Sequence, residues 1–233
     1  MLKSIMACAG LTCIGAAGLA ATAQQAPQNT PAPQQKQQIP PAIAGALGGL
    51  HVAVLENEEG GVVTVQNPQG ENAVVLFLEP GAAEEARQNS AIADMKVATI
   101  PLLQMMGSWD GPVVFEASSE EIDYANGLNA DDADYGAPVF FVLIDGQETH
   151  IQAGAGPITP ILLSSDEATD MVAQVTEQGI EAEKVEVMPI EFGTVISQLA
   201  SMPQDQGYRV FTHPDTAALI QSAQSGSQGN SQQ

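Results

Sequence analysis

The three histidines of this chain are its side chains best suited to acid–base catalysis or metal binding. They are His51, His150 and His213, and they lie far apart along the 233 residues. None has a second histidine four residues away, the spacing that brings two imidazoles onto one helix face to bind zinc. We therefore interpret all three as partly exposed polar residues at strand ends, without a metal.

An acidic run at residues 131–136, Asp-Asp-Ala-Asp-Tyr-Gly, is the nearest approach to a calcium loop. Counted from Asp132, glycine falls at the fifth position of the loop instead of the sixth. Leu143 stands where the loop needs a bidentate acid. The mismatch favours a solvated acidic loop over a calcium site.

Other catalytic and cofactor motifs are missing from the sequence. It contains no G-x-S-x-G elbow and no phosphate loop ending in Lys-Ser/Thr. The glycine-rich run at 153–157 precedes a predicted strand, whereas a dinucleotide fingerprint precedes a helix. Many carboxylates are present, but no pair is singled out for acid–base work. The sequence predicts a protein that is not an enzyme and has no cofactor.

Two apolar stripes are the remaining candidates for a binding role. In 102–109 and in 192–199, apolar residues recur at the spacing of one helix face. Such a face usually packs into a core, but methionine thioethers also adapt to varied apolar partners. We predict that client proteins bind beside these two helices, through Leu102, Met105, Met106, Trp109, Phe192, Val195, Ile196 and Leu199.

The elements that must position these stripes occur twice in the same order. Residues 46–126 and 137–221 each follow the order strand–strand–strand–helix–strand–helix–strand–helix. Lys-Val-Ala-Thr-Ile-Pro at 96–101 corresponds to Lys-Val-Glu-Val-Met-Pro at 184–189, a strand closed by proline. We predict an α/β fold (α+β, with mixed sheets) with an internal duplication, giving two pseudo-twofold-related halves joined by an acidic connector at 127–136.

Two local details of the repeat carry their own predictions. Asp145-Gly146 between two apolar runs is a strong signal for a two-residue hairpin turn. The first helix of the first half carries only small apolar residues, Ala82, Ala83 and Ala86, so we expect it to be short or loosely packed.

The N-terminal 23 residues have the pattern of a cleavable secretory signal. Lys3 precedes an apolar stretch, and Ala21-Thr22-Ala23 offers the small residues that a signal peptidase needs. A retained anchor is the alternative, but the stretch is short and weakly apolar for a spanning helix. Lipidation at Cys8 is another, although only seven residues precede it. Cys8 and Cys13 both fall inside the signal, so the mature protein has no thiol chemistry.

Composition describes the rest of the chain outside the repeats. Residues 24–45 are rich in Gln and Pro and should form a disordered tether, and 222–233 should form a loose tail. The chain carries 6 basic and 28 acidic residues, a net charge of −22. Such a surface repels nucleic acid and anionic lipids, and no other run is long enough to insert stably into a membrane.

Several segments of the second half resemble one protein family. They are Tyr135–Val142, Asp145-Gly146, Ile161–Ser164, Asp166–Gln178 and Val185–Ile190. Together they are similar to the family of the twenty-two-kilodalton intermembrane-space subunit of the chloroplast inner-envelope translocon (the Tic family), whose cyanobacterial relatives are exported to the periplasm. The resemblance covers most of 50–221 and consists of strand and helix patterns.

The resemblance implies a two-halved α/β fold with apolar pockets and a chaperone-like role in the periplasm. The implied partners are unfolded or translocating proteins and, in bacteria, an outer-membrane barrel-assembly protein. This chain departs from the plastid members in its bacterial-type signal, its acidity and its tether. These departures argue against plastid import and leave the clients open.

Two further functions stay open on the sequence. One is a small-molecule-binding module with a pocket between the two halves. The other is a secreted hydrolase, which would need carboxylates or a histidine converging in one cleft.

Overall fold

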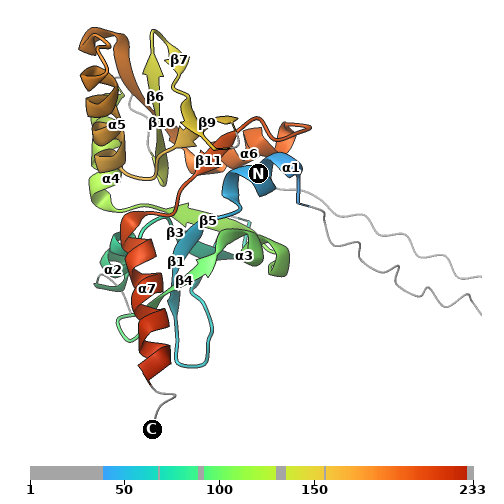
Figure 1. Ribbon diagram of the computed structural model, residues 1–233. Helices are drawn as coiled ribbons and strands as arrows, with labels where there is room; N and C mark the ends of the chain where they lie inside the picture. Colours follow the sequence, from blue (N-terminus) through green and yellow to red (C-terminus); the bar gives the residue numbers. More distant parts are fainter. Residues whose placement is uncertain (1–38, 68, 89–91, 130–134, 155, 230–233) are drawn as a thin grey trace, which may run out of the picture. The chain divides into compact units, whose positions relative to one another are not determined.

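The computed structural model describes residues 39–229, with gaps at 68, 89–91, 130–134 and 155 (Figure 1). All described residues belong to one compact unit, Lys36–Gln233. The predicted signal at 1–23, the tether up to residue 38, most of the acidic run and the last four residues lie outside the described residues. In the described part, no helix is long and apolar enough to cross a membrane.

The first half contains the predicted strands and helices in the predicted order. Short apolar runs form the strands, and a proline or a serine stands at the start of most helices. In chain order the elements are α1 (Pro41–Leu47), β1 (His51–Glu56), β2 (Thr64–Gln66), β3 (Asn72–Phe77), α2 (Pro80–Gln88), β4 (Lys96–Pro101), α3 (Leu102–Ser108), β5 (Val113–Glu116) and α4 (Ser119–Leu128).

The second half has the same order with one extra short strand and a 3₁₀ turn, Ala182–Lys184, after its first helix. Its elements are β6 (Pro138–Ile144), β7 (Gln147–Glu148), β8 (Ile151–Ala153), β9 (Gly156–Ile161), α5 (Ser165–Glu177), β10 (Val185–Glu191), α6 (Phe192–Ser201), β11 (Tyr208–Val210) and α7 (Pro214–Gly229). The Asp145-Gly146 turn joins β6 to β7, and both residues have positive φ, 52° and 76°, as a type I′ turn requires.

The strand pairings of the two halves correspond. β1 pairs with β4 and β6 with β10, both antiparallel. β3 pairs with β5 and β9 with β11, both parallel, and β2–β3 and β8–β9 are antiparallel. The first half forms one five-stranded sheet, whereas the second consists of two three-stranded sheets joined by a single bridge, Phe140–Leu162. The fold is therefore mixed α+β, as predicted.

The last helix of each half packs on the sheet of the other half. α4 ends the first half but lies against β6, β10 and α5 of the second, and α7 ends the second half but lies against β1 and β4 of the first (Figure 1). Each outer sheet face is thus covered by its own helix, α2 or α5, and by the exchanged helix. The two halves interlock, so neither completes its core alone.

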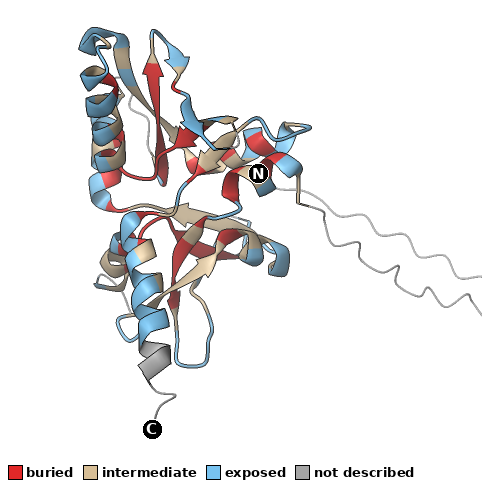
Figure 2. Ribbon diagram, in the orientation of Figure 1, coloured by how far each residue is buried: buried red, intermediate tan, exposed pale blue. Residues whose placement is uncertain are grey.

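The main core lies between the two halves. One buried cluster combines β1 and β3 with β6 and β9 and includes side chains of α1, α3 and α6. Two smaller clusters lie under the outer helices, one between α2 and the first-half strands β1 and β3 and one between β6 and the helices α4 and α5. Figure 2 shows the buried segments concentrated in the strands and in the inner faces of the helices.

Both ends of the described chain differ from the prediction of disorder. Residues 41–45, assigned to the tether, belong to α1, because Pro41 occupies a first-turn position and Ile43 and Leu47 are buried in the main core. Residues 222–229, assigned to the loose tail, continue α7. The Gln- and Ser-rich composition concealed the extension of α7, because both residues are tolerated within a helix. Helix α1 contains neither Gln nor Ser and was missed because the tether was extended into its Ala-rich segment.

Candidate functional site

The structure brings the two predicted client-binding helices onto the same core cluster. Leu102 of α3 and Phe192, Val195 and Leu199 of α6 are buried, with at most 3% of each residue exposed. These four form part of the main core, and Phe115 meets Phe192 edge-on at 4.9 Å between ring centroids. They therefore hold the two halves together.

The other four predicted residues reach the surface. Met105, Met106, Trp109 and Ile196 are half-buried and pack against the edge of the main core. Helix α1 touches both α3 and α6, so the two helices and their half-buried side chains border one region of the molecule. This region, which we call the α3–α6 surface, presents apolar side chains that retain exposed area.

The ring of Trp109 is held in place rather than free to swing. Its Nε1 donates a hydrogen bond to the carbonyl oxygen of Pro112, 3.0 Å away. The ring also covers Gly111, where a Cβ would lie 2.8 Å from ring atoms. A preorganised aromatic ring of this kind contributes contact area at a low entropic cost.

A small cavity of about 40 Å³ opens beside α6, between Val195, Leu199 and Tyr208. Its volume is sufficient for about one water molecule and not for a client side chain. Tyr208 donates a hydrogen bond to Oε2 of Glu148 at 2.8 Å, and burial together with this bond raises the pKa of Tyr208 to about 12.

A larger groove of about 660 Å³ lies between α2 and α7, over the start of β4. Its apolar lining includes Pro80, Val97 and Leu219, and Arg87 and Lys96 also line it. Because α2 belongs to the first half and α7 to the second, this groove is a pocket shared by the two halves. Its volume is within the usual range for small-molecule sites.

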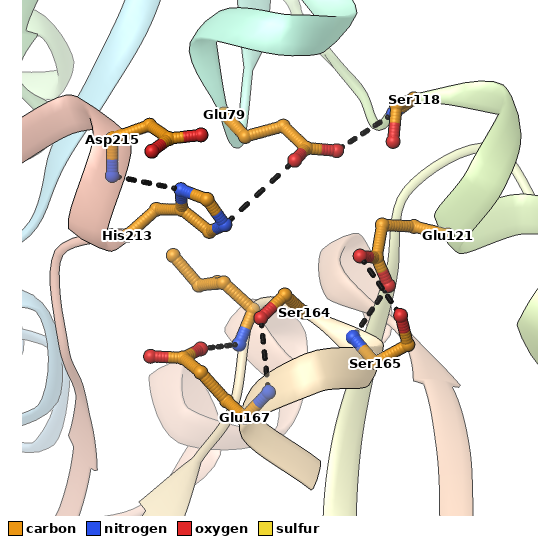
Figure 3. Close-up of polar contacts among 9 residues, drawn as sticks. Glu79, Ser118, Glu121, Ser164, Ser165, Glu167, His213 and Asp215 are labelled. Carbon is orange, nitrogen blue, oxygen red and sulfur yellow. Dashed lines mark hydrogen bonds and ion pairs between the residues drawn. The ribbon is translucent and has the colours of Figure 1, made fainter. Parts of the chain in front are cut away.

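A buried polar cluster lies where the exchanged helices begin (Figure 3). Oε1 of Glu79 accepts a hydrogen bond from the Ser118 N–H at the start of α4, at 3.1 Å. Oε2 of the same carboxylate lies 3.8 Å from Nε2 of His213, which precedes α7. Glu79 therefore contacts the starts of both exchanged helices.

A second glutamate joins α4 to α5 in the same cluster (Figure 3). Glu121 accepts hydrogen bonds from the N–H and the hydroxyl of Ser165, at 2.6 and 3.1 Å. Burial raises the pKa of Glu121 to about 7, and the nearby charge of Glu79 adds to this. In the described residues no three histidine, cysteine or acidic side chains are placed to hold a metal ion.

The histidines are only partly placed as expected. His51 begins β1 with its Nδ1 3.2 Å from the Gly49 carbonyl oxygen, and His150 is exposed between β7 and β8. The prediction for His213 is wrong, because it is 8% exposed and its Nδ1 accepts the Asp215 N–H at the start of α7. A histidine before Pro-Asp resembles a helix start, but its burial depends on a partner in the other half.

Comparison with known proteins gives structural matches alone. No protein-family model matches the chain, and no curated protein matches its sequence. Tic22 of Anabaena, described as a protein-transport protein, is 17% identical with a TM-score of 0.57, over 78% of this chain and 96% of that one. Tic22 of Plasmodium falciparum is 12% identical with a TM-score of 0.56, over 77% of this chain and 96% of that one.

These matches cover the folded part of the chain and nearly all of both solved proteins. At such low identity they establish the arrangement of elements and not the roles of individual residues. The chain has the fold of the Tic22 proteins, which confirms the resemblance found in its sequence.

Proposed function

We propose that this chain is a non-catalytic protein-transport factor of the periplasm that binds apolar segments of client proteins. The observation that carries the proposal is the α3–α6 surface, where two methionines, a tryptophan and an isoleucine are half-buried around one core. Flexible thioethers beside a rigid indole suit varied apolar partners. The protein-transport description of the Anabaena protein with the same fold supports this choice.

The role we infer is that of a holding chaperone for proteins in transit, including outer-membrane proteins handed to a barrel-assembly protein. The cleavable signal predicted at 1–23 would deliver the chain to the periplasm, where ATP is not available. A net charge of −22 keeps such a factor soluble while it carries an apolar client.

We further infer that the two halves are copies of one ancestral unit. Three kinds of strand pair recur in both halves, and each half ends in a helix that crosses to the other. In this arrangement α3 and α6 are equivalent elements, so the α3–α6 surface would combine two copies of one binding helix.

Suppression of aggregation by the mature protein tests the proposal. We expect several unfolded clients to stay in solution without ATP, and we expect Met105→Asp and Ile196→Asp to weaken this effect. Phe192→Asp is unsuitable, because Phe192 is fully buried and a charged carboxylate in its place would unfold the protein. Leu128→Asp, at a residue 42% exposed on α4, is the matched control.

The outcome is decided by the variants that remain folded. No suppression at several-fold molar excess over more than one client would refute the chaperone role. If Ile196→Asp suppressed aggregation as well as the wild-type protein, α6 would not be part of the client-binding surface. Thermal unfolding of each variant separates these outcomes from loss of structure.

A second candidate function, small-molecule binding, is favoured by the groove between α2 and α7. It is more than ten times larger in volume than the cavity beside α6, at about 660 Å³ against 40 Å³.

A further inference from the structure

Strand β4 forms one edge of the five-stranded sheet in the first half. The strands lie in the order β2-β3-β1-β4, with β5 on β3, so within the described residues β4 pairs with β1 alone. Every residue of β4 keeps some exposed area, whereas the inner strand β3 is buried from Ala73 to Phe77. The outer edge of β4 is therefore available to another strand.

The register of β1 and β4 shows which backbone groups lie on this edge. The Leu102 N–H donates to the Leu50 carbonyl oxygen at 2.9 Å, and this pair continues the register of the β1–β4 ladder. Bonded and non-bonded pairs alternate along an antiparallel ladder, so every second residue back from Leu102 bonds to β1. The residues between them, Val97 and Thr99, point their N–H and C=O groups away from β1. Within the described chain these groups have no backbone partner.

The edge of β10 in the second half is partly occupied by the chain itself. The Phe192 N–H donates to the Ala137 carbonyl oxygen at 2.9 Å, so the same alternation points the backbone groups of Val187 and Pro189 away from β6. The Pro189 carbonyl oxygen accepts a hydrogen bond from the Tyr135 hydroxyl at 3.3 Å. A side chain of the connector thus lies on the β10 edge, and no such contact is made on β4 by the described residues.

Both faces of β4 offer apolar neighbours to an added strand. On the inner face, Ala98 and Ile100 are half-buried and pack against the main core. On the outer face, Val97 packs against the cluster under α2 and lines the groove toward α7 together with Leu219. β4 contains no acidic residue, although the chain has 28. The edge therefore suits a segment with apolar side chains on both faces.

The edge of β4 is continuous with the α3–α6 surface. The strand ends at Pro101 and α3 begins at Leu102, with no loop between them. Ile100 of the strand and Met105 and Met106 of the helix pack against the same core cluster. A segment held on β4 therefore adjoins the side chains that carry the proposed function.

We propose that clients bind to β4 as an extended strand, so that part of the captured segment adds to the edge of the sheet. The N–H and C=O groups of Val97 and Thr99 bond to the client backbone, and apolar client side chains cover both faces of β4. The partner is an unfolded polypeptide segment rich in apolar residues. Backbone pairing does not depend on the client's side chains, so it suits varied clients. This inference rests on the proposed function and states how the client is held.

A second copy of this chain is a poorer occupant of the edge than a client segment. Lys96 and Pro101 stand at the two ends of β4, and lysine and proline are typical of edge strands that avoid pairing with their own kind. Each copy also carries a net charge of −22, so two copies repel each other. A short segment of a client avoids most of this repulsion.

Amide hydrogen exchange of the mature protein, followed residue by residue by NMR, tests the proposal. The probe is the heptapeptide Lys-Thr-Val-Ile-Val-Thr-Lys with both termini capped. The control peptide carries N-methyl groups on its three central residues, which keep the side chains and charge and block both alternating sets of N–H groups. With about 1 mM probe, we expect exchange at Val97 and Thr99 to slow at least tenfold and exchange in β10 to stay unchanged. The methylated peptide should protect neither residue.

A proline on each edge gives a matched pair of variants. Thr99→Pro removes an N–H that takes no part in the β1–β4 ladder, so the sheet should tolerate it. We expect it to weaken probe binding about tenfold, through the lost hydrogen bond and the bulk of the ring. Val187→Pro makes the same backbone change on the edge of β10 and should leave probe affinity unchanged. Thermal unfolding shows whether each variant is folded, and the exchange experiment on the wild-type protein decides if Thr99→Pro is not.

Several results would overturn the proposal. They are unchanged exchange at Val97 and Thr99 with the probe, equal protection by the methylated peptide, or wild-type affinity in folded Thr99→Pro. Protection of these two amides that rises with protein concentration in the absence of probe would assign the edge to a second copy. Protection confined to α3 and α6 would mean that clients bind the helices without adding a strand.

Failure of this inference and failure of the proposed function are distinguishable. If the wild-type protein suppresses aggregation but the probe protects neither Val97 nor Thr99, only binding as a strand is refuted. If the wild-type protein does not suppress aggregation, the chaperone role is refuted whatever the exchange experiment shows.

Discussion

The Glu79 carboxylate lies 3.8 Å from Nε2 of His213 and also accepts the N–H of Ser118 at 3.1 Å. Through these two contacts one side chain reaches the first turns of α4 and α7, the helices that the two halves exchange. Glu79 is only 8% exposed, so water cannot replace it freely. The interlocked arrangement therefore depends on a polar contact as well as on apolar packing.

Replacement of Glu79 should destabilise the protein more than a typical surface substitution. Glu79→Ala leaves the buried Ser118 N–H without its acceptor, and we expect a loss of about 1–3 kcal/mol in the free energy of unfolding. Urea denaturation measures this loss. Glu177→Ala, at an exposed residue that ends α5, should change stability by less than about 0.5 kcal/mol. A loss no larger than this in Glu79→Ala would contradict the assigned contact.

The pH dependence of stability should carry the signature of Glu121. In the unfolded chain its proton is lost near the ordinary pKa of 4.5, and in the folded protein burial raises the pKa to about 7. Between these values the folded state binds more protons, so the free energy of unfolding falls as pH rises from 4.5 to 7. The loss is up to about 3 kcal/mol at pH 8.

Glu121→Gln isolates this contribution, because its amide can keep hydrogen bonds to Ser165 without a charge. In the variant, the free energy of unfolding should no longer fall through this contribution between pH 4.5 and 7. The variant should therefore be more stable than the wild-type protein at pH 8. Urea denaturation at a series of pH values measures both effects. The control is Glu120→Gln, an exposed neighbour, which changes the net charge equally. Parallel curves for Glu121→Gln and wild type would refute the assignment.

Two buried threonine hydroxyls should make the protein less stable than it could be. Within the part of the chain that the structure describes, Oγ1 of Thr149 and Oγ1 of Thr216 are buried and have no hydrogen-bond partner, and Thr216 of α7 is fully buried. Thr216→Val removes the unpartnered hydroxyl at nearly constant shape, and we expect a gain of about 1 kcal/mol. Thr194→Val, at an exposed position of α6, should be near neutral. Destabilisation by Thr216→Val would show that the hydroxyl has a partner in solution.

Adding a single methyl group to the hairpin turn at Asp145-Gly146, by Gly146→Ala, should lower the stability of the protein. Gly146 has φ of +76°, which L side chains rarely adopt, so Gly146→Ala should cost about 1 kcal/mol. Gly107→Ala, within helix α3 where nothing lies within 4 Å of an added Cβ, should instead stabilise by about 0.5–1 kcal/mol. Thermal unfolding should show a lower midpoint for Gly146→Ala and a higher midpoint for Gly107→Ala than for the wild-type protein. A change of midpoint in the same direction for both variants would contradict the turn type.

Phe192 should contribute to the stability of the core and not to client binding. Its side chain is fully buried, and Phe192→Ala should cost about 3–5 kcal/mol in the free energy of unfolding. Met105→Ala, at a half-buried residue of the same core, should cost less. If Phe192→Ala stayed as stable as wild type, the ring would not be part of the main core.

The sequence alone determined where most strands and helices lie and which of their faces are apolar. Most strands, the order of helices and the Asp145-Gly146 turn follow from periodicity and turn chemistry, which act over a few residues. The alanines of α2 predicted a short or loosely packed helix, and α2 has 9 residues against 13 in its counterpart α5. The stripes of α3 and α6 were found as well, but periodicity does not say whether a stripe meets the core or a client.

Only the tertiary structure decided which elements meet. The exchange of α4 and α7, the burial of His213 against Glu79 and the groove between α2 and α7 all join residues far apart in the chain. Such contacts depend on how two sheets and their helices cover each other's apolar faces, and many pairings satisfy the same local pattern. For this reason the sequence marks the surfaces to be buried, whereas packing selects the partner of each and the space left between them.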